Sequence, residues 1–111
     1  MSTFDIDVAT AGEATRLTLR GEFDIANAPH LEREITRFVE SGGSRLVVDL
    51  RDLSFIDSTG LRIVLETRQR AADRGFELEL VRGPHQVQRV FELTGLEDRL
   101  PFVDAPNGEP R

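Results

Sequence analysis

Residues 49–61 decide the fold class and read Asp49-Leu50-Arg51-Asp52-Leu53-Ser54-Phe55-Ile56-Asp57-Ser58-Thr59-Gly60-Leu61. This stretch continues from residues 46–50, which form a short and nearly continuous apolar run that is typical of a parallel strand covered on both faces. From Ser58 to about Arg74 the apolar residues return at helical spacing, with Gly75 placed to end the helix. A buried strand that turns directly into a helix predicts an α/β fold, and such folds place their sites at strand ends.

The segments before this stretch predict a hairpin and a first helix. Apolar and polar residues alternate over 4–8 and again over 16–20, on either side of a turn near Gly12. After Gly21, the run Asn27-Ala28-Pro29 offers a helix cap and a first-turn proline. The apolar residues that then recur at helical spacing, before the glycine pair 42–43, are Leu31, Ile35, Phe38 and Val39.

The segments after it complete a mixed sheet. Residues 77–81 alternate as a strand, a third helix lies between the Gly83-Pro84 break and Gly95, and residues 100–103 suggest an edge strand. The predicted order is ββαβαβα with an optional last strand, which gives a mixed, mostly parallel sheet of four or five strands with helices packed against it. We expect one domain over residues 1–104 and a flexible tail over 105–111, which holds two prolines and a glycine.

Composition excludes several classes of function. A chain of 111 residues with 39% hydrophobic and 31% charged residues is an ordinary globular domain. Its net charge of −6 opposes binding to nucleic acid, which needs clustered cations. All 14 basic residues are arginine and cysteine is absent, so lysine chemistry, disulfides and thiolate metal sites are excluded. The N-terminus resembles no signal peptide and no apolar run could span a membrane, so we expect a cytoplasmic protein without a membrane partner.

The polar residues at the strand end have a purely structural interpretation. Either Asp57 or Ser58 can be the N-cap of the following helix, accepting a backbone N–H from its first turn. However, Asp57, Ser58 and Thr59 stand together where one cap suffices, and Gly60 lets another backbone approach the helix start closely. The excess of hydroxyl groups therefore favours an exposed functional surface.

Three separated segments carry a resemblance to a known family. Residues 55–61, with Gly21-Glu22-Phe23-Asp24 upstream and Val90-Phe91-Glu92-Leu93-Thr94-Gly95-Leu96 downstream, resemble the STAS-domain anti-sigma-factor antagonists over about residues 4–103. The resemblance implies that Ser58 is phosphorylated by an anti-sigma factor that is itself an ATP-dependent serine kinase. The unphosphorylated form would bind that kinase and release a sigma factor, and a serine phosphatase would reset the switch. It implies neither a cofactor nor an enzymatic activity for this chain.

The resemblance also names the residues that would contact the partner: Glu22, Asp24, Asp57, Ser58, Thr59, Gly60 and Arg62. Glu22 and Asp24 are otherwise ordinary loop residues, and Asp24 is placed to cap the next helix. Arg62 stands where glycine is frequent in the family, four residues after Ser58 and therefore on the same helical face. It can hold the phosphate or pair with Glu66, and the second is slightly favoured because one-turn ion pairs are common.

Other functions compete with this interpretation. A STAS subunit of a lipid-transport ABC system, or another STAS interaction module, would use the same helix surface for another partner. An enzyme would need Asp57 or Ser58 activated by a base or a metal, and neither His30 nor His85 can be placed nearby from the sequence. Aspartyl phosphorylation of the receiver type at Asp57 lacks its lysine.

Gly60 gives a test of function against structure. A glycine inside a helix normally destabilises it relative to alanine, so its presence needs a reason. If the reason is close approach of the partner, Gly60→Ala keeps its stability and loses kinase binding. If the reason is an internal contact, the variant loses stability. The functional reason is the expectation here.

Overall fold

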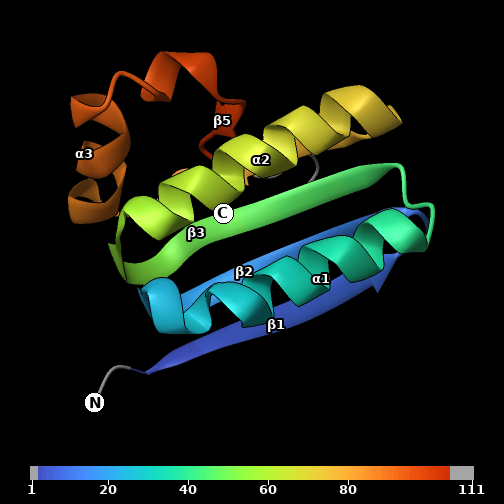
Figure 1. Ribbon diagram of the computed structural model, residues 1–111, viewed down its shortest axis with the longest axis horizontal. Helices are drawn as coiled ribbons and strands as arrows, with labels where there is room; N and C mark the ends of the chain where they lie inside the picture. Colours follow the sequence, from blue (N-terminus) through green and yellow to red (C-terminus); the bar gives the residue numbers. More distant parts are fainter. Residues whose placement is uncertain (1–2, 106–111) are drawn as a thin grey trace.

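Five strands and three α-helices alternate along residues 3–105, the part of the chain that the computed structural model describes (Figure 1). In chain order they are β1 (Phe4–Ala11), β2 (Ala14–Phe23), α1 (Ala28–Glu40), β3 (Arg45–Ile56), α2 (Ser58–Arg74), β4 (Glu77–Val81), α3 (His85–Leu93) and β5 (Phe102–Val103). Two short 3-10 helices, η1 (Ile25–Asn27) and η2 (Glu97–Arg99), lie before α1 and after α3. The predicted element order, including the optional edge strand, is confirmed.

The strands form one sheet in the order β1-β2-β3-β4-β5. Strands β1 and β2 are an antiparallel hairpin, and every later neighbour is parallel, because α1, α2 and α3 carry the chain back between strands. The sheet is therefore mixed and mostly parallel, as predicted. Strand β3 is longer than the predicted residues 46–50, because its second half pairs with the end of β2 as far as Phe23 opposite Ile56.

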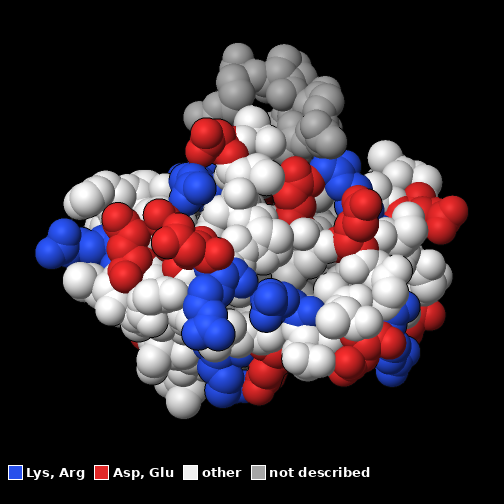
Figure 2. Space-filling view, turned by 90° about the horizontal axis from the view of Figure 1, so that it is seen from above, with Lys and Arg blue, Asp and Glu red and all other residues white. Residues whose placement is uncertain are grey.

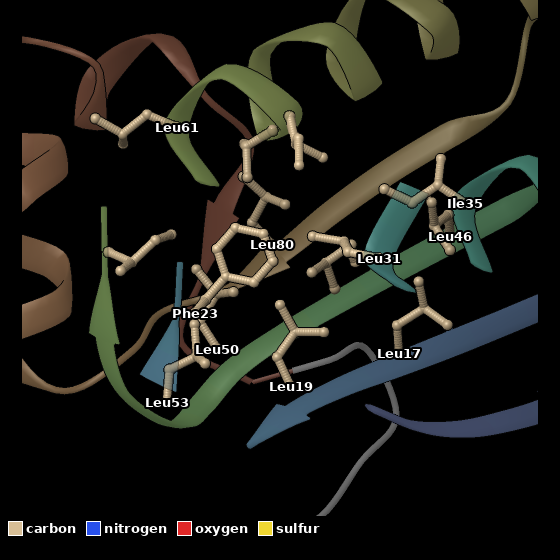
Figure 3. Packing of buried hydrophobic residues seen from close by; sticks show 14 of the residues in the cluster. Leu17, Leu19, Phe23, Leu31, Ile35, Leu46, Leu50, Leu53, Leu61 and Leu80 are labelled. Atoms are coloured by element: carbon tan, nitrogen blue, oxygen red, sulfur yellow. The ribbon is translucent and has the colours of Figure 1, made fainter. Parts of the chain in front are cut away.

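The hydrophobic core lies between the sheet and its helices: α1 and α2 run side by side across one face (Figure 1), and α3 adds further residues to the buried cluster. Leu17, Leu46 and Leu50 on neighbouring strands are fully buried. Figure 3 shows them near Leu31 and Ile35 of α1, and Leu61 in the first turn of α2 belongs to the same buried cluster. Each such side chain stabilises the fold by about 1.5–3 kcal/mol. The core thus fixes the first turn of α2 over the ends of β2 and β3.

Several residues that alternate with these core positions on β2 and β3 are polar and form ion pairs. Arg20 lies 3.6 Å from Asp7 of β1 and 3.6 Å from Asp52 of β3. Asp49 is buried, and its carboxylate accepts hydrogen bonds from the Arg51 backbone and guanidinium, the closest at 2.6 Å. Burial by itself raises the pKa of Asp49, but the hydrogen bonds and charge of Arg51 outweigh it and hold the pKa below 3.8.

Helix α1 begins differently from the sequence prediction. Asn27 makes no side-chain capping hydrogen bond, so its predicted capping role is wrong. Its amide Nδ2 instead donates backwards, to the Glu22 carbonyl at 3.0 Å and to Asp24 Oδ1 at 3.2 Å. The predicted cap at Asp24 is confirmed for the short helix η1, because Asp24 Oδ1 accepts from Ala26 N at 3.0 Å. These side-chain hydrogen bonds stabilise the turn between β2 and α1.

Two sequence predictions concern the chain as a whole. Of the predicted flexible tail, residues 106–111 lie outside the described residues. Between residues 3 and 105, no helix combines the length and the apolar character needed to span a bilayer.

Candidate functional site

The candidate site lies where β2 and β3 end next to each other. Glu22 pairs with Phe55 and Phe23 with Ile56, so both strands reach the same edge of the sheet. From there β2 continues through η1 into α1, whereas β3 turns directly into α2 at Ser58. Two segments more than thirty residues apart therefore meet at one edge, which is the carboxyl end of the parallel strands.

Asp57 caps helix α2. Its backbone is extended, with φ −108° and ψ −174°, and its Oδ1 accepts hydrogen bonds from Thr59 N at 3.0 Å and Gly60 N at 3.3 Å. Of the two capping candidates in the sequence, the structure thus selects Asp57. Its carboxylate is already engaged by two backbone N–H groups, as a helix start requires.

Ser58 is the first residue of α2 and is exposed. Because Asp57 does the capping, the Ser58 hydroxyl is not needed there, and it makes no hydrogen bond to any residue between 3 and 105. Thr59, the next residue, is half-buried. Ser58 is therefore the more accessible of the two hydroxyl groups, and it stands at the positive end of the helix dipole, where a phosphate is stabilised.

Gly60 packs inward and not toward solvent. It is buried, and a Cβ at this position would lie 2.5 Å from Ile56 Cγ1 and 3.0 Å from Phe23 Cδ2. These separations are too short for side chains that are themselves in the core. The structure thus corrects the expectation for Gly60: the internal contact explains the glycine, since it lets α2 approach the ends of β2 and β3.

Arg62 forms the one-turn ion pair that the sequence favoured. Its Nη1 lies 2.9 Å from Glu66 Oε1, and also 4.0 Å from Glu32 Oε2 of α1. The Arg62 side chain is about half exposed, at 51%. It lies one turn along α2 from Ser58 and so is close to the candidate site while being held by two carboxylates.

The remaining predicted residues differ in how available they are. Asp24 caps η1 and accepts from Asn27, so its carboxylate has a structural role. Glu22 is exposed, and its carboxylate forms no ion pair with any residue from 3 to 105. Glu22 is therefore the acidic side chain at this edge that is most available to a partner.

Two apolar residues at the same edge were not identified from the sequence. Ile25 in η1 is 72% exposed, and Phe55 near the end of β3 is 48% exposed. The available signal was the adjacent pair Phe55-Ile56, since neighbouring residues of a strand point to opposite faces and only one of them can enter the core. Ile25 gave no such signal, because one apolar residue in a short turn has no periodicity.

The described surface carries charged side chains of both signs (Figure 2). Between residues 3 and 105, no three histidine, aspartate or glutamate side chains gather closely enough to hold a metal ion. On the face shown in Figure 2, arginine and acidic side chains are interspersed, and no extended basic patch is visible there. Arginine and acid neighbours of this kind neutralise one another locally.

Comparisons with known proteins agree on one family. The STAS domain model matches residues 5–106. An anti-sigma-B factor antagonist of Bacillus subtilis (strain 168) is 31% identical over 85% of this chain and 85% of its own length. The crystal structure of an anti-sigma factor antagonist from Mycobacterium paratuberculosis has a TM-score of 0.83 at 26% identity, covering 93% of this chain and 87% of that one.

A further neighbour shows likeness of fold. The structure of the Bacillus cell fate determinant SpoIIAA in the phosphorylated form has a TM-score of 0.72 at 22% identity, covering 95% of this chain and 93% of that one. The family model spans nearly all of the described residues, and the sequence relative is similar over most of both chains. The chain therefore belongs to the STAS domain family and, within it, to the anti-sigma-factor antagonists.

Proposed function

We propose that this protein is an anti-sigma-factor antagonist switched by phosphorylation of Ser58. In the unphosphorylated form it binds an anti-sigma factor with serine kinase activity, and a sigma factor is released. The observation that supports this most directly is the division of roles between neighbours: Asp57 caps α2, which leaves the exposed Ser58 hydroxyl available. The family relatives named as anti-sigma-B factor antagonists support the same function. A bacterial cytoplasmic location and a role in transcription regulation follow from this proposal.

The chemistry takes place on this chain but is catalysed by its partners. The kinase transfers the γ-phosphoryl group of ATP: a bond forms between Ser58 Oγ and phosphorus, the bond to ADP breaks, and the hydroxyl proton passes to a base of the kinase. A serine phosphatase hydrolyses the phosphate ester and restores the hydroxyl. The chain itself is then not an enzyme and needs no cofactor.

Phosphate can release the partner without a large rearrangement. It adds about −1.5 to −2 charges next to Asp57, and the helix N-terminus stabilises it by roughly 0.3–1 kcal/mol. A partner surface shaped for a small neutral hydroxyl then meets extra volume and negative charge. Glu22, Asp24, Asp57, Thr59 and Arg62 would be further contact residues in this proposal, and Gly60 sets the position of the helix start from inside.

The direct test is phosphopeptide mapping after incubation with ATP and the candidate kinases of the same cell. We expect acid-stable label on Ser58 in the wild type and none in Ser58→Ala. Ser54→Ala is the matched control, since Ser54 is an exposed serine on the same strand end. Full labelling of Ser58→Ala would refute the assignment and direct attention to Thr59.

The mimic of the phosphorylated state tests the switch. Ser58→Asp should fold as the wild type does, because a carboxylate is favourable in the first turn of a helix. It should bind the kinase poorly, because its charge opposes docking. Affinity is measured by calorimetric titration and folding by thermal melting. An unchanged affinity of Ser58→Asp would contradict the proposed switch. Partner capture would then show whether the chain binds a lipid-transport complex instead of a kinase.

A further inference from the structure

Two exposed apolar side chains lie on the segments that form the edge carrying Ser58. In the described part of the chain, the large hydrophobic residues that are exposed are Val8, Ile25, Phe55, Leu65 and Leu93. Ile25 and Phe55 lie on the two segments that meet at the candidate site, with 72% and 48% of their surfaces exposed. Neither is needed by the core, whose members come from other positions. Aromatic residues such as Phe55 are enriched at protein interfaces, so this pair is a candidate contact surface.

The chain path places both residues close to Ser58. Phe55 is three residues before Ser58, which limits their Cα separation to roughly 11 Å. Ile25 follows Phe23 by two residues, and Phe23 is paired with Ile56. With strands about 4.8 Å apart, Ile25 and Ser58 lie within roughly 20 Å. A standard interface covers about 800 Å² per partner, a disc roughly 32 Å across, so the three backbone positions lie within the span of one interface.

We propose that Ile25 and Phe55 are the apolar anchors by which the anti-sigma factor kinase holds this protein while it reaches Ser58. This inference rests on the proposed function and identifies where its binding free energy comes from. Interfaces draw most of their affinity from a few large side chains that are buried on binding, with a polar rim around them. Glu22, exposed beside Phe55 in the strand register, and Asp24 supply an acidic rim, so the kinase surface should present apolar pockets flanked by cationic groups.

This arrangement also explains how a phosphate on Ser58 could release the kinase. Ser58 lies at the same edge as the two anchors, on the segment that begins α2. A phosphate there keeps the partner surface away from that edge, and the anchors then lose their pockets. The affinity lost on phosphorylation would thus include the apolar contacts of Ile25 and Phe55, in addition to charge repulsion.

Matched substitutions test the inference. Ile25→Ser is compared with Leu93→Ser, since Leu93 is 73% exposed, and Phe55→Thr is compared with Val8→Thr, since Val8 is 46% exposed. Val8 pairs with Leu17, six residues along β2 from Phe23 and so about 20 Å from the site edge. Threonine keeps the strand preference of the replaced residues. Thermal melting confirms that all four variants fold, and affinity is titrated against the purified kinase that labels wild-type Ser58.

We expect Ile25→Ser and Phe55→Thr each to weaken kinase binding about tenfold or more, and both controls to bind within about twofold of the wild type. If both anchor variants bind with wild-type affinity while the kinase still labels wild-type Ser58, the anchor proposal is wrong and the proposed function is unaffected. Equal losses in all four variants would also overturn them, since the effect would not be local. If no candidate kinase labels wild-type Ser58, the proposed function and the anchors both fall.

Discussion

At the scale of single residues, adjacent residues at the start of α2 have different structural roles. Asp57 satisfies the first N–H groups of α2, and Gly60 lets that helix approach the strands beneath it. Ser58, between them, has neither task. A phosphoacceptor that took part in capping would couple each phosphorylation to the stability of the helix start, and the proposed assignment of Ser58 avoids that coupling.

Gly60→Ala should destabilise the protein. Its Cβ would lie within 3.0 Å of both Ile56 and Phe23, which are buried. Overpacking of this kind costs about 1–3 kcal/mol, against a gain of up to about 1 kcal/mol from helix propensity. Urea unfolding measures the balance. The loss should shrink in an Ile56→Ala background, where space is available, and equal losses in both backgrounds would argue against the packing explanation.

Asp49 should make stability depend on pH in the acid range. Its pKa in the folded protein is held below the ordinary 3.8, because Arg51 favours the charged form more than burial opposes it. The stabilisation by the charged carboxylate is therefore fully present at a pH above the ordinary pKa, and it is lost as the pH falls through the lower pKa of the folded protein. Asp49→Asn should cost about 1.5–3 kcal/mol at neutral pH, since the charge-assisted hydrogen bonds that Arg51 donates to the buried carboxylate are lost.

The measurement is urea unfolding of the wild type and Asp49→Asn at neutral pH and below pH 3.8. The difference between the two proteins should narrow at the acid end, because the wild-type carboxyl is then taking up its proton. Asp52→Asn is a suitable control, since Asp52 is exposed and pairs loosely with Arg20 at 3.6 Å. A gap between wild type and Asp49→Asn that stays constant with pH would contradict the role assigned to this charge.

Some of these residue roles could be predicted from the sequence and others could not. The cap of α2 was narrowed to Asp57 or Ser58, because short polar side chains at a strand-to-helix turn have few other structural tasks. The inward contact of Gly60 depends on how closely β2, β3 and α2 approach one another, which is set by tertiary packing. Asn27 likewise looks like a cap from the sequence, but its Nδ2 donates to Asp24 and to the Glu22 carbonyl, which holds the side chain toward the preceding turn.

At the scale of elements, helix α2 owes its start to a single side chain. Asp57→Ala should lower stability by about 0.5–2 kcal/mol, because the N–H of Thr59 loses its acceptor and the N–H of Gly60 keeps only the Asp57 backbone carbonyl. Asp57→Asn keeps an acceptor oxygen of the same geometry and should stay close to the wild type. Thermal melting of both variants checks this. Equal losses in Asn and Ala would mean that the charge, and not the capping hydrogen bond, stabilises the helix.

The same pair of variants separates structure from recognition. Asp57→Asn removes the charge but preserves the helix start, so a loss of kinase affinity in that variant would belong to the interface. Had only Asp57→Ala been tested, a weakened complex could reflect a frayed helix. The cap and the contact are thus distinguishable at one position.

The bounds of the helices and strands show where the periodicity of apolar residues was sufficient to predict them. Helices α1 and α2 were predicted to within a few residues, because long amphipathic patterns and their terminal glycines leave little freedom. Strand β3 was predicted too short, since Arg51 and Asp52 interrupt its apolar run. The second half of β3 pairs with β2 through register shifts between Thr18 and Arg20 and between Gly21 and Glu22. Such irregularities depend on both paired strands, so the sequence of one strand does not predict them.

At the scale of the whole molecule, the core and the switch are separate. The buried cluster lies between the sheet and its helices, whereas Ser58 is exposed at the sheet edge. A phosphate on Ser58 therefore changes the net charge from −6 to roughly −8 without entering the core. The proposed switch thus alters what the surface can bind while the fold stays the same.

Hydrogen exchange on the unphosphorylated and phosphorylated proteins tests this separation. We expect the amides of β3 and β4 in the core to keep their protection, because the contacts that bury them are unchanged. Differences should be confined to about the first turn of α2 and the adjoining end of β3, where the phosphate meets the helix dipole. Ser58→Ala treated with the same kinase and ATP is the control, since it experiences the incubation without the modification. Loss of protection across β3 and β4 on phosphorylation would show that the signal passes through the fold, and release of the partner would then have to be explained by a conformational change.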